Sequence, residues 1–150
     1  MEEKANLQHT ENQKEESMQP ERVHDQAGQQ SPIEMPGRSA EFDFNREVDE
    51  LRHSPEWESG IARKVLVRYP DLQVTLRRMK ANTRIPEHHN PGRICVQTIL
   101  GHIRMRADDK LFDLPQGKML VLDRAITHDV EAVEESAFLL TVAYPETAGR

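Results

Sequence analysis

The feature that most constrains the fold is a run of short segments with strand-like alternation, which begins at residue 64 and continues almost to the C-terminus. In LQVTLRRM, Leu72, Val74 and Leu76 alternate with polar residues at 73, 75 and 77, a pattern that predicts a half-buried strand. The other segments of this kind are KVLVRY, ICVQTIL, HIRMRA, LFDL, KMLVLD, HDVEAV and AFLLTVAY. About eight or nine short strands with no helix between them are typical of a β-sandwich or a closed β-barrel.

Turn residues separate these segments. ADDK, residues 107–110, predicts a hairpin turn, and LPQG fits a type I turn with Pro115 in the second position and Gly117 in the fourth. Ile85 precedes Pro86 and is therefore expected to be extended. The strands are thus expected to be connected by short turns.

The N-terminal part of the chain has a different character. Residues 1–40 contain no aromatic residue and carry eight acidic residues against four basic ones. Such a segment cannot bury enough apolar surface to offset the entropy lost on ordering. We therefore expect a disordered acidic tail over residues 1–40, which ends in a linker rich in Pro, Gly and Ser.

One short helix is expected between the tail and the strands. Asp43 is a candidate N-cap, and Phe44, Val48 and Leu51 follow at helical spacing before Pro55 ends the run. The predicted organisation is an acidic tail at 1–40, a helix and N-terminal extension at 41–60, and a barrel at 61–150.

The composition argues against several classes of function. The net charge is −6 and the basic residues are dispersed, whereas a nucleic-acid binder needs clustered Lys and Arg. Cys95 is the only cysteine, which excludes an internal disulfide and a cysteine-rich zinc cluster. No apolar run is long enough to span a membrane, and the first residues do not resemble a signal peptide. We therefore expect a cytoplasmic protein that binds neither nucleic acid nor membranes.

The stretch PEHHNPGR contains the clearest candidates for metal ligands. It places His88 and His89 side by side between two prolines. Adjacent residues of a regular strand point to opposite faces, so only one of these imidazoles is expected to face inward. A metal site would then require further ligands from elsewhere in the chain.

The order of these pieces resembles the cupin superfamily over residues 64–144. The shared features are a Pro-His-His loop, a strand ending in Gly101, a hairpin, a Pro-x-Gly turn and a strand that opens on His128. The resemblance implies a double-stranded β-helix, or jelly-roll, barrel. Cupins carry two motifs, whose two histidines, glutamate and later histidine commonly hold a divalent metal inside the barrel.

The second cupin motif fits this chain better in spacing than in identity. Counting from Gly117, His128 falls on the position of the metal-binding histidine. Asp123, Ala125 and Ala132 stand where the family has proline, glycine and asparagine.

In the first motif, alignment on Gly101 places Ile94 where the family has its glutamate ligand. A three-residue gap assigns the two histidine positions to His88 and Asn90, and a four-residue gap assigns them to Glu87 and His89. The first alignment is preferred because Pro91 then follows the second position.

The resemblance implies a divalent metal such as Mn, Fe, Zn or Ni, held by His88, His128 and either Asn90 or a rotated His89. Because Ile94 contributes no donor, this set is weaker than the full cupin set. In the alternative interpretation both histidines are structural and the barrel contains no metal.

Two further residues are candidates for ligand binding. Arg93 could pair with the carboxylate of a small ligand, although a salt bridge to a neighbouring acidic residue is the simpler interpretation. Gln97 would join the site only if the alternation of its strand were broken.

Two functions are therefore predicted from the sequence. The first is a small cupin that binds a divalent metal, a small polar ligand or both inside the barrel. The alternative is a metal-free cupin that acts as a non-catalytic ligand sensor or interaction module. In either case we expect a homodimer, because pairing covers exposed sheet edges.

Overall fold

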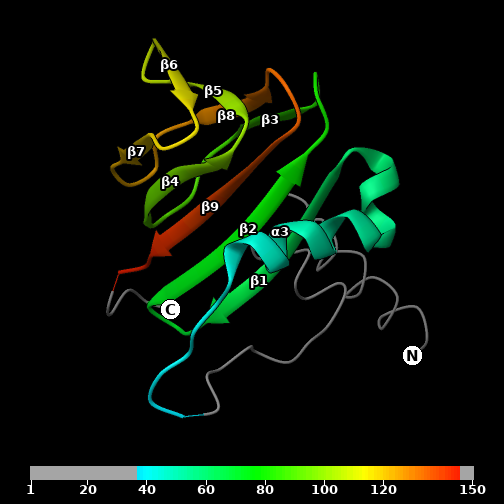
Figure 1. Ribbon diagram of the computed structural model, residues 1–150. Helices are drawn as coiled ribbons and strands as arrows, with labels where there is room; N and C mark the ends of the chain where they lie inside the picture. Colours follow the sequence, from blue (N-terminus) through cyan, green and yellow to red (C-terminus); the bar gives the residue numbers. More distant parts are fainter. Residues whose placement is uncertain (1–36, 146–150) are drawn as a thin grey trace, which may run out of the picture. The chain divides into compact units, whose positions relative to one another are not determined.

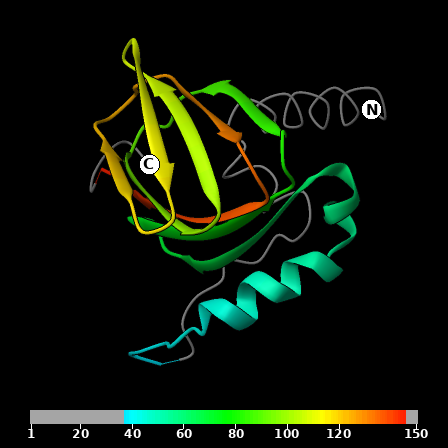
Figure 2. The same cartoon turned by 45° about the horizontal axis from the view of Figure 1, so that its top comes forward.

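Two antiparallel β-sheets make up most of the fold (Figures 1 and 2). The structure is a computed structural model and describes residues 37–145. The predicted tail at 1–40 therefore lies almost wholly outside the described residues. No helix within residues 37–145 is long and apolar enough to cross a membrane. The nine strands are β1 Ile61–Arg68, β2 Leu72–Met79, β3 Arg84–His88, β4 Arg93–Leu100, β5 His102–Ala107, β6 Lys110–Pro115, β7 Met119–Leu122, β8 His128–Ala132 and β9 Ser136–Ala143.

The strand order is that of a double-stranded β-helix. The five-stranded sheet has the order β1-β2-β9-β4-β7, and the four-stranded sheet has the order β3-β8-β5-β6. Strands distant in sequence, such as β2 and β9, are therefore hydrogen-bonded neighbours, and every pair is antiparallel. The predicted all-β jelly-roll barrel is confirmed.

The main hydrophobic core lies between the two sheets. The five-stranded sheet contributes Phe138, Leu140 and Val142 of β9 and Ile94 of β4, all almost fully buried. The opposite sheet contributes side chains from β3, β5, β6 and β8 to the same cluster. We call the sheet faces that carry these residues inward. Burial on this scale is the main force that holds the two sheets together.

A short helical segment covers the outer face of the five-stranded sheet (Figure 1). Helix α3, Phe44–Glu50, begins as predicted at Asp43, whose carboxylate accepts hydrogen bonds from the backbone N–H groups of Asn45 and Arg46 at 3.0 and 3.4 Å. Two 3₁₀ helices follow, η1 Leu51–His53 and η2 Pro55–Ser59. The apolar side chains of this segment form a second buried cluster with β1, β2 and β9.

The second cluster corrects the prediction for β2. This strand is buried on both faces rather than half-buried: only Leu72 and Val74 are partly exposed. Leu76 belongs to the outer cluster beneath the helices. Gln73 and Thr75 lie on the other face of β2, which is inward. Val74 and Leu76 therefore face the helical segment, whereas Gln73 and Thr75 face the barrel. The pattern ends at the last two residues, because Arg78 donates to the carbonyl oxygen of Val48 and Met79 lies in the main core.

The hairpin at ADDK forms as predicted, and the turn at LPQG is displaced by one residue. The backbone N–H of Lys118 donates to the carbonyl oxygen of Pro115 at 3.1 Å, so Pro115 is first in the turn and Gly117, with a φ of 93°, is third. The predicted placement of Pro115 second and Gly117 fourth is wrong, because the third position of this turn needs a positive φ.

At the β5–β6 hairpin, Asp108 and Asp109 have φ angles of 52° and 60°, as a two-residue type I′ turn requires, and Ala107 pairs with Lys110. Gly101 also has a positive φ, 78°, and joins β4 to β5. The predicted hairpin at ADDK is confirmed.

Candidate ligand-binding site inside the barrel

His88 and His128 meet at one end of the barrel. They face each other in the β3–β8 register, and their ring centroids are 4.3 Å apart with an interplanar angle of 64°. His128 is 4% exposed, and His88 is half-buried. The structure therefore brings together the two histidines that the sequence placed in one site.

Backbone carbonyls orient both rings in the same way. Nδ1 of His88 lies 2.8 Å from the carbonyl oxygen of Pro86, and Nδ1 of His128 lies 2.9 Å from that of Ile126. A carbonyl only accepts hydrogen bonds, so Nδ1 carries the proton in both rings. In the neutral imidazole the lone pair is then on Nε2, the nitrogen that can accept a proton or contact a ligand.

The other two predicted metal ligands are placed less favourably. His89 is exposed to solvent. Asn90 is 6% exposed, but its side-chain oxygen accepts the N–H of Gly92 at 3.0 Å and its backbone oxygen accepts the N–H of Ala125 at 2.9 Å. Asn90 therefore holds the loop after β3 in shape.

The donor set does not fit a metal held by three or four protein ligands. Ile94, at the position of the cupin glutamate, is 3% exposed and packs in the main core. Within residues 37–145 no group of three or more His, Cys, Asp or Glu side chains is arranged to hold an ion. His88 and His128 supply two imidazoles, and a metal would need its remaining donors from another source.

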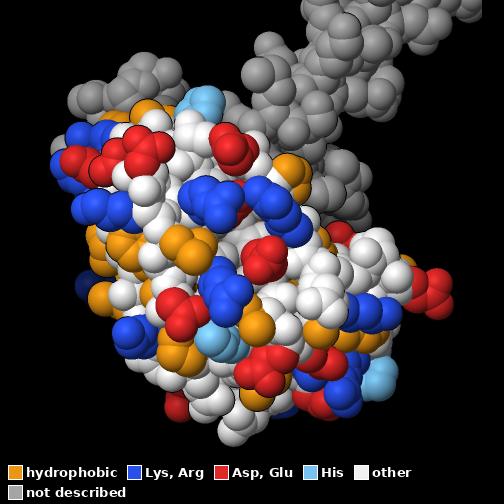
Figure 3. Space-filling view, turned by 90° about the horizontal axis from the view of Figure 1, so that it is seen from above, with side chains coloured by type: hydrophobic (Ala, Val, Ile, Leu, Met, Phe, Trp, Pro, Cys, Tyr) orange, Lys and Arg blue, Asp and Glu red, His pale blue; other side chains and the backbone are white. Residues whose placement is uncertain are grey.

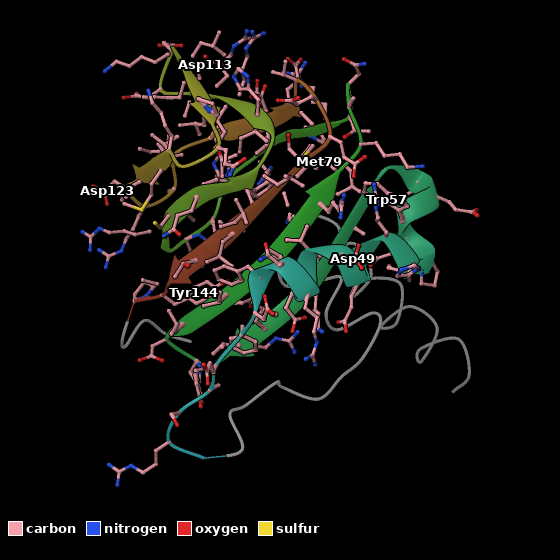
Figure 4. The ribbon with its side chains drawn as sticks, in the orientation of Figure 1. Asp49, Trp57, Met79, Asp113, Asp123 and Tyr144 are labelled. Carbon is pink, nitrogen blue, oxygen red and sulfur yellow. The ribbon has the colours of Figure 1, made fainter. Side chains whose placement is uncertain are left out.

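Arg93 lies on the outer face of the five-stranded sheet. Its Nε is 3.0 Å from a carboxylate oxygen of Asp123, which lies at the periphery of the molecule in Figure 4. The backbone N–H of Arg124 and the guanidinium of Arg93 hold the pKa of the Asp123 carboxyl below its usual value. Arg93 thus forms the salt bridge that the simpler interpretation predicted, and a role in ligand binding remains a prediction.

Gln97 also points away from the barrel interior. It pairs with Leu139, which belongs to the outer cluster, and its Nε2 lies 3.5 Å from the sulfur of Met119. The alternation of β4 is therefore unbroken at this residue. The condition under which Gln97 would join the site is not met.

The sequence interpretation missed a polar wall on the inward face of β1 and β2. Gln73, Thr75 and Arg77 of β2 are 3%, 0% and 5% exposed. They stand opposite Val142, Leu140 and Phe138 of β9 respectively, and directly opposed residues of antiparallel strands project to the same face. Those three β9 residues lie in the main core, so the polar side chains face the barrel interior.

Two arginines of β1 extend this polar wall. Arg63 stands opposite Arg77, and Arg68 stands opposite Gln73. The sequence signal was present in the polar positions of LQVTLRRM, but alternation does not say which face is inward. We define the polar wall as Arg63, Arg68, Gln73, Thr75 and Arg77.

Comparison with solved structures identifies the class of fold. A conserved protein of unknown function from Streptococcus pyogenes has a TM-score of 0.62 and 24% identity, and the match covers 78% of this chain and 97% of that one. A cupin 2 conserved barrel domain protein from Leptotrichia buccalis has a TM-score of 0.55 and 30% identity over 57% of this chain and 42% of that one. No family model matches the sequence, and no curated protein matches it in sequence.

An enzyme is also among the structural neighbours. A variant of salicylate 1,2-dioxygenase from Pseudoaminobacter salicylatoxidans has a TM-score of 0.62 and 17% identity over 78% of this chain and 38% of that one. At this identity the similarity shows the fold alone. The chain has the cupin fold, and its resemblance to the cupin superfamily is confirmed.

Proposed function

We propose that this protein binds a small polar ligand inside the barrel, at the end where His88 and His128 meet. The observation that carries the proposal is the pair of inward imidazoles, each held by a backbone carbonyl so that Nε2 carries the lone pair. The nearby polar wall supports it. It places buried hydrogen-bonding side chains, Gln73 and Thr75 among them, on the inward face of the five-stranded sheet.

The fold is consistent with this role. Cupin-fold neighbours include an enzyme named for salicylate as well as proteins of unknown function. One barrel supports unrelated chemistries, so the fold does not identify the ligand. No catalytic residue is assigned. The cytoplasmic location and the absence of nucleic-acid and membrane partners stay predictions.

The test is a ligand screen read at the histidine rings by ¹⁵N–¹H NMR of the full chain. The screen contains small carboxylic acids, their primary amides and small amines. We expect at least one class to shift the ring signals of His88 and His128. His53, which is exposed and belongs to η1, is the internal control and should not shift. If no compound moves the two barrel histidines selectively, the proposal is wrong.

A metal is the second candidate, because the fixed Nδ1–carbonyl contacts resemble those that orient metal-binding imidazoles. Elemental analysis after loading with Mn, Fe, Zn or Ni and desalting tests it. Metal retained by the wild type and by His89→Ala, but lost in His88→Ala and His128→Ala, would support a two-histidine site. Retention that is indifferent to both substitutions would rule it out.

A further inference from the structure

A hollow that opens to solvent lies where the β4–β5, β6–β7 and β8–β9 connections meet the helical segment. Its volume is about 590 Å³, which is in the range of small-molecule sites. Arg52 of η1 and Arg78 of β2 line it together with residues of the three connections. In Figure 4, Met79 marks the end of the five-stranded sheet at which the hollow lies, and Tyr144 marks the other end.

The hollow is at the end of the barrel opposite the two facing histidines. Strand β5 begins at His102, which lines the hollow, and Ala107 at its other end pairs with His128. The hollow and the histidine pair are therefore separated by the length of β5, roughly 16 Å. A ligand in the hollow would not occupy the site proposed above.

Backbone hydrogen bonds hold the walls of the hollow in place. The N–H of Gln116 donates to the carbonyl oxygen of Gly101 at 2.9 Å, which joins the β6–β7 turn to the β4–β5 turn. The N–H of Val133 donates to the carbonyl oxygen of His102, also at 2.9 Å, which joins the β8–β9 connection to the same turn. The walls are thus formed before a ligand arrives, and this lowers the entropy cost of binding.

Two guanidinium groups at the hollow share a single carboxylate. Nε and Nη2 of Arg78 both donate to Oε2 of Glu135, Nε at 2.8 Å, and Nη1 donates to the carbonyl oxygen of Val48. Nη2 of Arg52 lies 3.7 Å from the same Oε2, beyond hydrogen-bond distance, and its side chain is 52% exposed. The two arginines and Glu135 leave a net charge of +1, and Arg52 keeps N–H donors for a ligand.

Glu134 supplies an opposite charge at the same hollow. Its side chain is exposed, and among residues 37–145 it makes no hydrogen bond or ion pair. Arg52 pairs with Glu135 and not with Glu134. One positive and one negative charge therefore line the hollow without neutralising each other.

We propose that this hollow binds a small zwitterion of the α-amino-acid class. Its carboxylate pairs with Arg52 and its ammonium group with Glu134. An aliphatic side chain packs on Leu100, which is 37% exposed, and on Pro115, both of which line the hollow. A ligand with one charge would satisfy only one of the two protein charges, so complementarity favours the zwitterion.

The experiment uses the full chain and three probes with one side chain: leucine, N-acetylleucine and leucinamide. At pH 6.5 leucine carries both charges, N-acetylleucine only the carboxylate and leucinamide only the ammonium group. We expect leucine to raise the melting temperature in a concentration-dependent manner. In ¹⁵N–¹H NMR it should shift the backbone N–H signals of Gly101, His102 and Gln116, but not the ring signals of His88 and His128.

Both single-charge analogues should bind at least about tenfold more weakly than leucine, the scale of a hydrogen bond to a charged group. Arg52→Gln should weaken leucine binding by a similar factor and remove the preference for leucine over leucinamide. Glu134→Gln should remove the preference for leucine over N-acetylleucine. Arg46→Gln and Glu131→Gln are the matched controls, because both side chains are exposed and do not line the hollow. They should bind leucine as the wild type does.

Three results would overturn the zwitterion site. They are unchanged N–H signals of Gly101, His102 and Gln116 with leucine, equal binding of leucine and either analogue, and leucine binding that survives both Arg52→Gln and Glu134→Gln. If leucine shifts the rings of His88 and His128 instead, this inference fails and the proposed function stands. Shifts confined to the hollow support this inference, and the proposed function is then decided by its own screen.

Discussion

At the scale of single residues, two glycines in turns differ in how closely other backbone atoms approach them. Gly101 and Gly117 both have positive φ angles, 78° and 93°. A Cβ at Gly101 would lie 2.2 Å from the backbone oxygen of Glu135, whereas a Cβ at Gly117 would meet nothing within 4 Å. The backbone of His102 is also tied to Ser136, which donates to one group and accepts from the other at 3.0 and 2.8 Å. The β4–β5 turn is therefore packed against the β8–β9 connection.

The two glycines make a matched pair of substitutions. Gly117→Ala should lower the free energy of unfolding by about 1–2 kcal/mol, the cost of the left-handed backbone conformation alone. Gly101→Ala should cost more, about 3 kcal/mol or above, because the backbone of Glu135 must also move. Urea denaturation of both variants measures the difference. Equal losses would mean that the close approach at Gly101 is not tight in solution.

A charged residue on the outer face of the four-stranded sheet, Asp129, is more buried than the sequence predicts. Alternation in HDVEAV, residues 128–133, predicts that Asp129 lies on the face opposite His128 as a solvated charge. Asp129 does face outward, but it is 5% exposed, pairs with Arg84 at 2.5 Å and accepts the backbone N–H of Arg106 at 3.1 Å. The prediction of a solvated charge is wrong, because Arg84 of β3 and strand β5 enclose it from both sides.

At the scale of secondary-structure elements, β2 connects the two hydrophobic clusters. Its inward face carries the polar wall, and its outer face carries Leu76 beneath the helical segment. The helical segment covers this apolar sheet face with the stripe of Phe44, Val48 and Leu51. Trp57 of η2, the only tryptophan, packs against the same cluster.

Leu76→Ala tests the contribution of this outer cluster. Leu76 is 0% exposed, so the substitution should lower the free energy of unfolding by about 2–5 kcal/mol. Trp57 fluorescence should respond in the native state, because the cavity adjoins its cluster. Leu111→Ala on β6 is the control, since Leu111 is 57% exposed and its loss should cost no more than about 0.5 kcal/mol. Similar losses in the two variants would contradict a packed interface between helix and sheet.

At the scale of the whole molecule, one sheet edge is left apolar. Strand β7 is the last strand of the five-stranded sheet, and Met119 and Val121 on it are 55% and 57% exposed. The face seen in Figure 3 instead carries basic and acidic side chains side by side. An edge strand with exposed apolar residues favours pairing with another chain.

We therefore expect a homodimer that pairs through β7. Light scattering at a protein concentration of about 50 μM should give the mass of a dimer for the wild type. Two copies that pair through the same strand form a two-fold interface, which is complete with two subunits. The double variant Met119→Lys, Val121→Glu should be monomeric, and Leu111→Glu, on the edge strand of the other sheet, should stay dimeric. A monomeric wild type would refute the dimer, and a dimeric double variant would exclude β7 as the interface.

The sequence by itself determined most of the strands and the β5–β6 turn. Alternation in HIRMRA and the positive-φ requirement at ADDK are local properties, and both held in the structure. His88 and His128 were placed in one site through the resemblance to cupins, and the structure brings their rings together. The helix start at Asp43 is local in the same sense, because the N-cap carboxylate satisfies N–H groups within three residues of itself.

Only the tertiary structure decided which face of β2 is inward and which polar residues share the interior. Alternation separates the two faces of a strand, and it identifies the core only when one face meets water. In this protein the helical segment buries the outer face of β2, so Leu76 and Arg77 are both buried, on opposite sides. The polar positions of the wall could be read from the sequence, but their inward orientation could not, because pairing with β9, some 60 residues away in the chain, defines which side is the barrel.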